Sequence, residues 1–86
     1  MGERSRESTR RGEQDALRET LREVRLAAGL TAKELSLRMR AHHSFVSRIE
    51  RGQRTIDVIE FLDIAEAAGR NPEEVFVAFL DRVRRQ

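Results

Sequence analysis

The segment from His42 to Gly52, which reads HHSFVSRIERG, mixes apolar side chains with histidine, serine and arginine. Val46 and Ile49 are three positions apart, a spacing that places both side chains on one face of a helix. The polar side chains on the other face are those of His43, Ser44, Ser47 and Arg48. Imidazole, hydroxyl and guanidinium groups can hydrogen-bond to base edges or phosphates. The segment is therefore a candidate surface for binding nucleic acid.

The same segment contains groups that could suggest a metal site or a nucleophile. His42 and His43 are adjacent, so on a helix they point about 100° apart and seldom bind one ion. The chain has no cysteine, and no carboxylate stands at ligand spacing from them. No base is placed to activate Ser44 or Ser47. We therefore expect no metal, no cofactor, no small-molecule ligand and no enzymatic activity.

Charge is distributed unevenly along the chain. Sixteen of the seventeen cationic residues are arginine, whose planar fork suits phosphates and guanine edges. Residues 38–54 hold five arginines against one glutamate, whereas residues 55–81 hold one arginine against seven carboxylates. A basic segment next to an acidic one is typical of a protein that turns one face toward a polyanion. An ordinary solvated surface is the alternative interpretation.

The 86 residues are enough for one domain with a small core. Residues 1–13 lack periodic apolar residues and are rich in arginine, glutamate and serine, so we expect a disordered basic tail there. Residues 14–86 are expected to form the domain. No apolar run is long enough for a membrane span or a secretory signal, which favours a cytoplasmic protein.

The domain is expected to be all-α. Apolar residues recur at helical spacing over about 15–28, 32–39, 43–51, 56–68 and from 72 onward. Thr31 and Glu34 have the spacing of a capping box before the second helix. Thr55 and Asn71 are the expected N-caps of the fourth and fifth helices, and Pro72 suits a first helical position. In the fourth helix the expected buried stripe is formed by Ile56, Ile59, Leu62 and Ala65, widened by Phe61, Ile64 and Ala68.

The second and third of these helices are short and are joined by about three residues, from Arg40 to His42. Two short helices joined in this way form a helix-turn-helix unit. The later helix of such a unit fits the major groove of DNA, and its first turn can meet base edges. The earlier helix lies across the DNA backbone, where its N-terminal amides favour a phosphate. The arrangement thus favours DNA binding.

Three segments, GLTAKEL, SFVSRIERG and FLDIAEAAG, follow one another with the spacing of a known family. From about Leu17 to Leu80 the sequence resembles the phage repressor and Cro class of helix-turn-helix regulators, the XRE family. The resemblance implies a compact five-helix bundle, the lambda repressor-like DNA-binding domain, in agreement with the expected helices. It also implies double-stranded DNA as the partner and the third helix as the reader of bases.

The resemblance further implies particular site residues. Those expected at bases or phosphates are Ala32, Lys33, His43, Ser44, Ser47, Arg48, Arg51, Gln53 and Arg54. The family often pairs an arginine of its first helix with a glutamate at the end of its third. In this chain these positions are Arg25 and Glu50, and we expect a structural ion pair.

The sequence departs from the family pattern at three positions. Ala32 stands where glutamine is common, which removes a side-chain contact to phosphate. Arg40 stands where the turn often has glycine, which costs on the order of 1 kcal/mol if the backbone is left-handed there. His42 replaces the usual serine or threonine cap of the third helix, and histidine is the poorer cap.

The fifth helix carries more apolar residues than a small bundle needs. We expect a homodimer interface formed by Phe76, Phe79, Leu80 and Val83. Paired third helices about 34 Å apart would then read two half-sites. We therefore predict a sequence-specific DNA-binding transcriptional regulator, a repressor, that acts as a homodimer on a palindromic operator. The alternative is a protein-interaction module such as an antitoxin or a helical adaptor.

Overall fold

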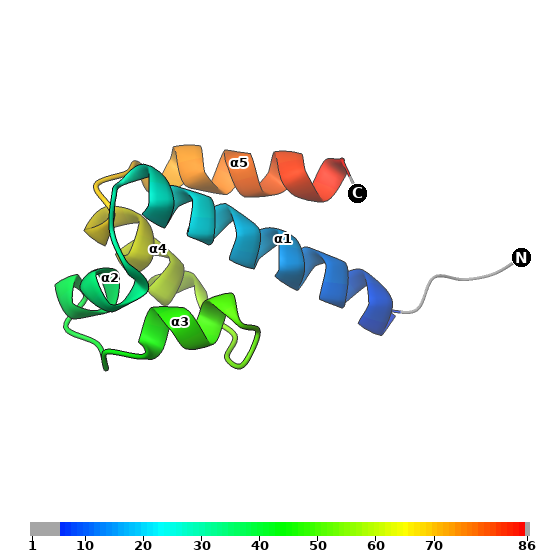
Figure 1. Ribbon diagram of the computed structural model, residues 1–86. Coiled ribbons are helices and arrows are strands. Elements are labelled where there is room, and N and C mark those ends of the chain that lie inside the picture. The colour runs from blue at the N-terminus through cyan, green and yellow to red at the C-terminus, as the bar shows by residue number, and fades with distance from the viewer. Residues whose placement is uncertain (1–5, 86) are drawn as a thin grey trace, which may run out of the picture.

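The computed structural model describes the backbone of residues 6–85 and the side chains of residues 11–85. This part of the chain forms five helices and no strand (Figure 1). They are α1 (Arg6–Ala27), α2 (Ala32–Arg38), α3 (Phe45–Glu50), α4 (Val58–Ala67) and α5 (Pro72–Arg84). The predicted all-α fold with five helices is confirmed.

The helices form two groups. α1 and α5 lie side by side and run in opposite directions (Figure 1). Arg82 of α5 donates hydrogen bonds to Glu19 and Glu23 of α1, which holds the two helices together. α3 and α4 pack against α1, α2 packs on α3 and α4, and the N-terminal end of α1 projects away from these three helices (Figure 1). The helix-turn-helix unit of α2 and α3 is therefore at the edge of the molecule.

α1 begins earlier than the sequence predicted. Residues 6–13, expected within a disordered tail, belong to this helix, and residues 1–5 of that tail lie outside the described residues. Five of these eight residues are arginine or glutamate, which are good helix formers. An anchored helix is also readily extended, because each added residue gains a backbone hydrogen bond.

One cluster of apolar side chains from all five helices forms the core. Leu35 of α2 and Val75 of α5 are fully buried, and Leu21 and Val24 of α1 are nearly so. Val46 and Ile49 of α3 join the same cluster. Because the core includes residues of every helix, it fixes α3 relative to α1 and α2.

α4 differs from the prediction in its start. Asp57, not Thr55, is the N-cap: its carboxylate accepts the Glu60 N–H at 2.8 Å, and the Glu60 carboxylate accepts the Asp57 N–H at 3.0 Å. This reciprocal pair is a capping box that the sequence analysis missed. The three-residue spacing of Asp57 and Glu60 could have indicated this capping box from the sequence.

The buried face of α4 also differs in part from the expected stripe. Ala65 is buried as predicted, but Ile59 is 65% exposed and Leu62 is exposed too. The widening residues Phe61 and Ile64 are buried instead. α4 is apolar around most of its circumference, so its own sequence does not decide which side faces the core. The packing against α1, α2 and α5 decides it.

α2 and α5 begin as predicted. Thr31 Oγ1 accepts the Glu34 N–H at 3.0 Å, and the Glu34 carboxylate accepts the Thr31 N–H at 2.8 Å. The second of these bonds lowers the pKa of Glu34. Asn71 caps α5, with Pro72 as its first residue. The cap at Thr31 fixes the start of α2, the helix that leads into the turn before α3.

Candidate nucleic-acid interface

The turn between α2 and α3 begins at Arg40, whose φ of 59° places it in the left-handed region. Arg40 is the only residue other than glycine with a positive φ in the described chain. The backbone is held there because the Ala41 N–H donates to the Ser36 carbonyl at 3.0 Å. A left-handed arginine is strained, since its Cβ approaches the following carbonyl. The turn therefore has the geometry for which the family often uses glycine.

α3 begins at Phe45, two residues later than predicted, so His43 lies in the turn before the helix. Ser44 occupies the N-cap position, but its side chain makes no capping bond. Its N–H instead donates to His42 Nδ1 at 3.2 Å, and its Oγ lies 2.8 Å from the same nitrogen. The ring of His42 thus holds the turn that leads into α3.

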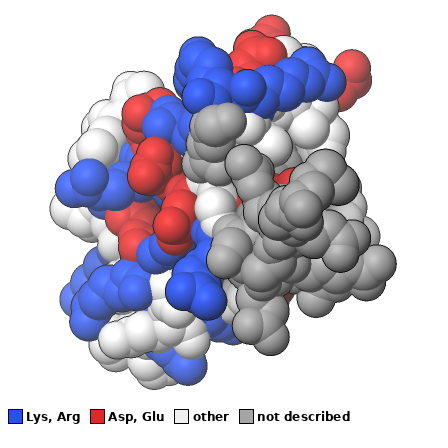
Figure 2. All heavy atoms as spheres, turned by 90° about the vertical axis from the view of Figure 1, so that its right-hand side faces the viewer, with Lys and Arg blue, Asp and Glu red and all other residues white. Residues whose placement is uncertain are grey.

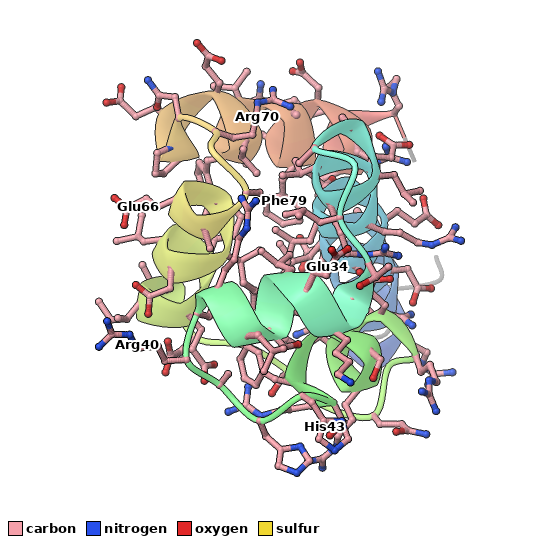
Figure 3. The ribbon with its side chains drawn as sticks, turned by 60° about the vertical axis from the view of Figure 1, so that its left-hand side comes forward. Glu34, Arg40, His43, Glu66, Arg70 and Phe79 are labelled. Atoms are coloured by element: carbon pink, nitrogen blue, oxygen red, sulfur yellow. The ribbon has the colours of Figure 1, made fainter. Side chains whose placement is uncertain are left out.

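One side of α3 is anchored in the core and the other is open. Val46 and Ile49 are 3% and 2% exposed. The exposed residues among the candidate DNA contacts are Lys33, His43, Arg48, Arg51 and Gln53. The half-buried ones are Ala32, Ser44, Ser47 and Arg54. The imidazole of His43 points away from the body of the protein, below α2 and α3 (Figure 3).

The open side of α3 keeps most of its hydrogen-bonding capacity for a ligand. In residues 11–85, the side chains of Arg48 and Arg51 form no ion pair and no side-chain hydrogen bond. Ser47 Oγ donates to the Ser44 carbonyl at 3.0 Å, which leaves its lone pairs as acceptors. Two unpaired guanidinium groups beside a hydroxyl suit an anionic partner with hydrogen-bond acceptors.

Arg54 has a different environment from the other candidate contacts. Its two terminal nitrogens bind the Glu60 carboxylate at 3.0 and 2.7 Å, and its guanidinium stacks 4.6 Å from the centre of the Phe45 ring. The hydrogen bonds from Arg54 lower the pKa of Glu60. Arg54 therefore ties the loop after α3 to both α3 and α4, and only part of its guanidinium remains for a phosphate.

Arg25 and Glu50 form the ion pair that the family resemblance implied. Arg25 Nε and Nη2 donate to the two carboxylate oxygens of Glu50 at 2.7 and 2.8 Å. Arg25 Nη1 also donates to the Leu30 carbonyl at 2.8 Å. The bond to Glu50 raises the pKa of Arg25. The pair links α1 to the C-terminal end of α3.

Charge on the surface follows the arrangement of the helices. In the view of Figure 2, Lys and Arg side chains gather along the lower edge, at the height of α3, and again at the top, and carboxylates lie between the two groups. An open basic side of α3 next to an acidic band would orient a polyanion toward α3.

A profile of the helix-turn-helix family matches residues 21–75, more than half of the chain. An XRE-family like protein from Pseudomonas syringae pv. tomato str. DC3000 is 36% identical, with 87% of this chain and 92% of that chain covered and a TM-score of 0.80. The chain belongs to the XRE family of helix-turn-helix proteins.

Two further solved structures share the XRE-family fold. The restriction-modification controller protein C.AhdI from Aeromonas hydrophila is 33% identical, with 73% of this chain and 96% of that chain covered and a TM-score of 0.66. The clp gene regulator ClgR from Corynebacterium glutamicum is 24% identical, with 84% and 77% covered and a TM-score of 0.74, a likeness of fold alone. No curated protein matches the sequence.

Two arginines beside α3 were not among the site residues predicted for this XRE-family chain. Arg22 of α1 lies 3.9 Å from Glu50, and the guanidinium of Arg18 lies where a Cβ on Gly52 would fall. Both line a hollow of about 420 Å³ that also includes Ser47 and Arg51. Their proximity to α3 could not be predicted from the sequence, because α1 meets the end of α3 only in the folded bundle.

The exposed apolar surface of the XRE-family chain includes only part of the dimer interface that the sequence predicted. Phe76 is 47% exposed, but the other three expected interface residues, Phe79, Leu80 and Val83, are half-buried on a helix that packs along α1. The exposed apolar side chains of α4 and α5 are Val58, Ile59, Leu62, Phe76 and Val77, and we call this set the apolar face. All of them except Ile59 line a groove of about 490 Å³.

The described helices include none that is both long and apolar enough to cross a membrane. The described histidines and carboxylates form no group of three that could hold a metal ion.

Proposed function

We propose that this protein is a sequence-specific DNA-binding transcriptional regulator, a repressor, that acts as a homodimer on a palindromic operator. One observation supports this most directly: α3 buries Val46 and Ile49 and leaves its opposite side open, with Arg48 and Arg51 unpaired in the described chain. A helix held in this way can enter the major groove without losing core contacts. The action is binding without catalysis.

The candidate contacts divide into two roles. His43, Ser44, Ser47 and Arg48 would meet base edges, because they lie on or before the first turns of α3. Lys33 at the start of α2, and Arg51 and Gln53 after α3, would meet phosphates and set the register. Ala32 contributes backbone there, since its side chain packs on the core. Arg54 contributes charge while it stays bound to Glu60.

The homodimer is proposed through the apolar face. A two-fold axis would pair this face with its own copy, which would cover apolar side chains that a monomer leaves in water. The name of one relative, a restriction-modification controller that is 33% identical to this chain, supports a regulatory role. Such a regulator would act where the DNA lies, and we propose the cytoplasm as that place.

The test begins with selection of bound duplexes from a random DNA pool, followed by titration of the selected duplex at several salt concentrations. We expect one enriched sequence with two-fold symmetry, and a log–log salt slope that is negative because phosphate contacts release counterions. Equal affinity for selected and scrambled duplexes, or a flat salt response, would contradict the proposal. Purification with a different protein and no retention of DNA would favour the interaction module.

A further inference from the structure

Ser36 lies in the middle of α2, where its side chain is fully buried. Its hydroxyl donates to the Ala32 carbonyl at 2.8 Å, one turn earlier in the same helix. The same oxygen accepts the N–H of Val46, which belongs to α3, at 3.0 Å. Ser36 thus connects the two helices of the helix-turn-helix unit by one hydroxyl group.

The bond to Val46 meets a need at the start of α3. The first N–H groups of a helix have no partner within the helix, and a buried N–H without a partner destabilises the fold. Ser44, at the N-cap position, makes no capping bond with its side chain. The Val46 N–H therefore depends on a hydroxyl from another helix.

Ser36 also holds the turn that precedes α3. Its backbone carbonyl accepts the Ala41 N–H at 3.0 Å, directly after the left-handed Arg40. A single residue of α2 thus binds both the turn and the first turn of α3. Any shift of α3 along or away from α2 would break the bond between Ser36 Oγ and Val46 N–H.

We infer that Ser36 is a positioning residue whose hydroxyl sets the place of α3 and thereby selects the base edges that His43 and Ser44 meet. The inference rests on the proposed function. It predicts that the hydroxyl affects discrimination between DNA sequences more than it affects binding to DNA in general, since phosphate contacts come from other residues.

Three variants of Ser36 test the hydroxyl. Ser36→Ala removes it, and Ser36→Thr against Ser36→Val compares side chains of equal shape with and without it. Thr20→Val is the matched control, because Thr20 is a buried helical residue whose hydroxyl donates to the Ala16 carbonyl at 2.8 Å and, in the described chain, accepts no amide from another helix. Each variant is measured by hydrogen exchange of the Val46 amide and by affinity for the selected duplex and for a scrambled one.

We expect Ser36→Ala and Ser36→Val to lose protection of the Val46 amide and to lower the ratio of the two affinities by about three- to tenfold, the effect of one buried hydrogen bond. Ser36→Thr and Thr20→Val should keep the protection of the Val46 amide and the ratio of the two affinities. Two results would overturn this inference and leave the proposed function standing. One is unchanged protection of the Val46 amide in Ser36→Ala. The other is an unchanged ratio of the two affinities in Ser36→Ala when the wild-type chain binds the selected duplex more tightly than the scrambled one. If the wild-type chain binds no duplex while Val46 exchange still responds to Ser36, the proposed function fails, and the base-selecting role fails with it.

Discussion

Arg48 and Arg51 differ from the other arginines near α3 in what their guanidinium groups contact. Arg25 and Arg54 each bind a glutamate through two hydrogen bonds. Arg48 and Arg51 have no such partner in the described chain and are exposed. A guanidinium with no protein partner loses no internal bond when it binds a base or a phosphate. At the scale of single residues, these two arginines are the strongest candidates for DNA contacts.

Arg48→Ala should weaken binding to the selected duplex by about 1–3 kcal/mol, the usual effect of losing a base contact by arginine. Fluorescence anisotropy titration would measure it. Arg70→Ala is the matched control, because Arg70 is an exposed arginine far from His43 and α3 (Figure 3). Equal losses in the two variants would mean that Arg48 acts only through net charge.

Arg40→Gly should stabilise the protein by about 0.5–1 kcal/mol, because glycine adopts the left-handed backbone without strain. The larger conformational entropy of glycine in the unfolded chain offsets part of this gain. Urea unfolding would measure the change. Gly29→Ala is the opposite experiment: Gly29 has φ +74°, and a Cβ there would meet no atom within 4 Å, so only backbone strain is added. Stabilisation by Gly29→Ala would show that strain at positive φ is not the controlling factor.

At the scale of elements, the loop after α3 is held by contacts with both of its neighbours. Arg54 binds Glu60 of α4 and stacks on Phe45 of α3. The same Glu60 caps α4 with Asp57. One carboxylate therefore joins the end of the helix-turn-helix unit to the start of α4.

The link predicts how stability depends on pH. Since the folded-state pKa of Glu60 is lowered, mainly by Arg54, its contribution is complete above the unfolded glutamate pKa of about 4.3 and is lost as pH falls through the lower folded value. Glu60→Gln should lower the urea midpoint at pH 7 and reduce the loss of stability on acidification. Gln can still accept the Asp57 N–H, so the cap remains.

Asp63→Asn is the control for this experiment. Asp63 lies on the same helix, is exposed and forms no ion pair in the described chain. We expect its substitution to leave the pH dependence unchanged. An identical pH profile for wild type and Glu60→Gln would contradict the role given to the Arg54–Glu60 pair.

At the scale of the whole molecule, α3 and the apolar face belong to different parts of one rigid bundle. α3 packs on α1 and α2, whereas the apolar face is on α4 and α5. A dimer through the apolar face would therefore leave α3 of each copy open. Two recognition helices held at a fixed distance would then read two half-sites, which one copy alone cannot do.

Val77→Glu should weaken the homodimer at least tenfold, about 1.4 kcal/mol, because it places a charge in an apolar interface. Sedimentation over a concentration series would measure the change, and affinity for the palindromic duplex should fall with it. Leu26→Glu is the control, since Leu26 is 52% exposed against 54% for Val77 and lies outside the groove. A wild-type chain that stays monomeric at all concentrations and on DNA would contradict the dimer.

Much of the fold could be predicted because local chemistry decides it. The capping box of Thr31 and Glu34, the cap at Asn71 and the inward spacing of Val46 and Ile49 depend on residues a few positions apart. The family resemblance added the pair of Arg25 and Glu50, which no local pattern contains.

Sequence alone thus determined that five helices form, which face of α3 enters the core and which family the chain belongs to, but not where α1, α3 and α4 begin. Only the tertiary structure decided which side of α4 is buried, which arginines stay unpaired, and that Ser36 caps α3. These features depend on distances between residues far apart in the chain, and such distances exist only once the helices have packed against one core.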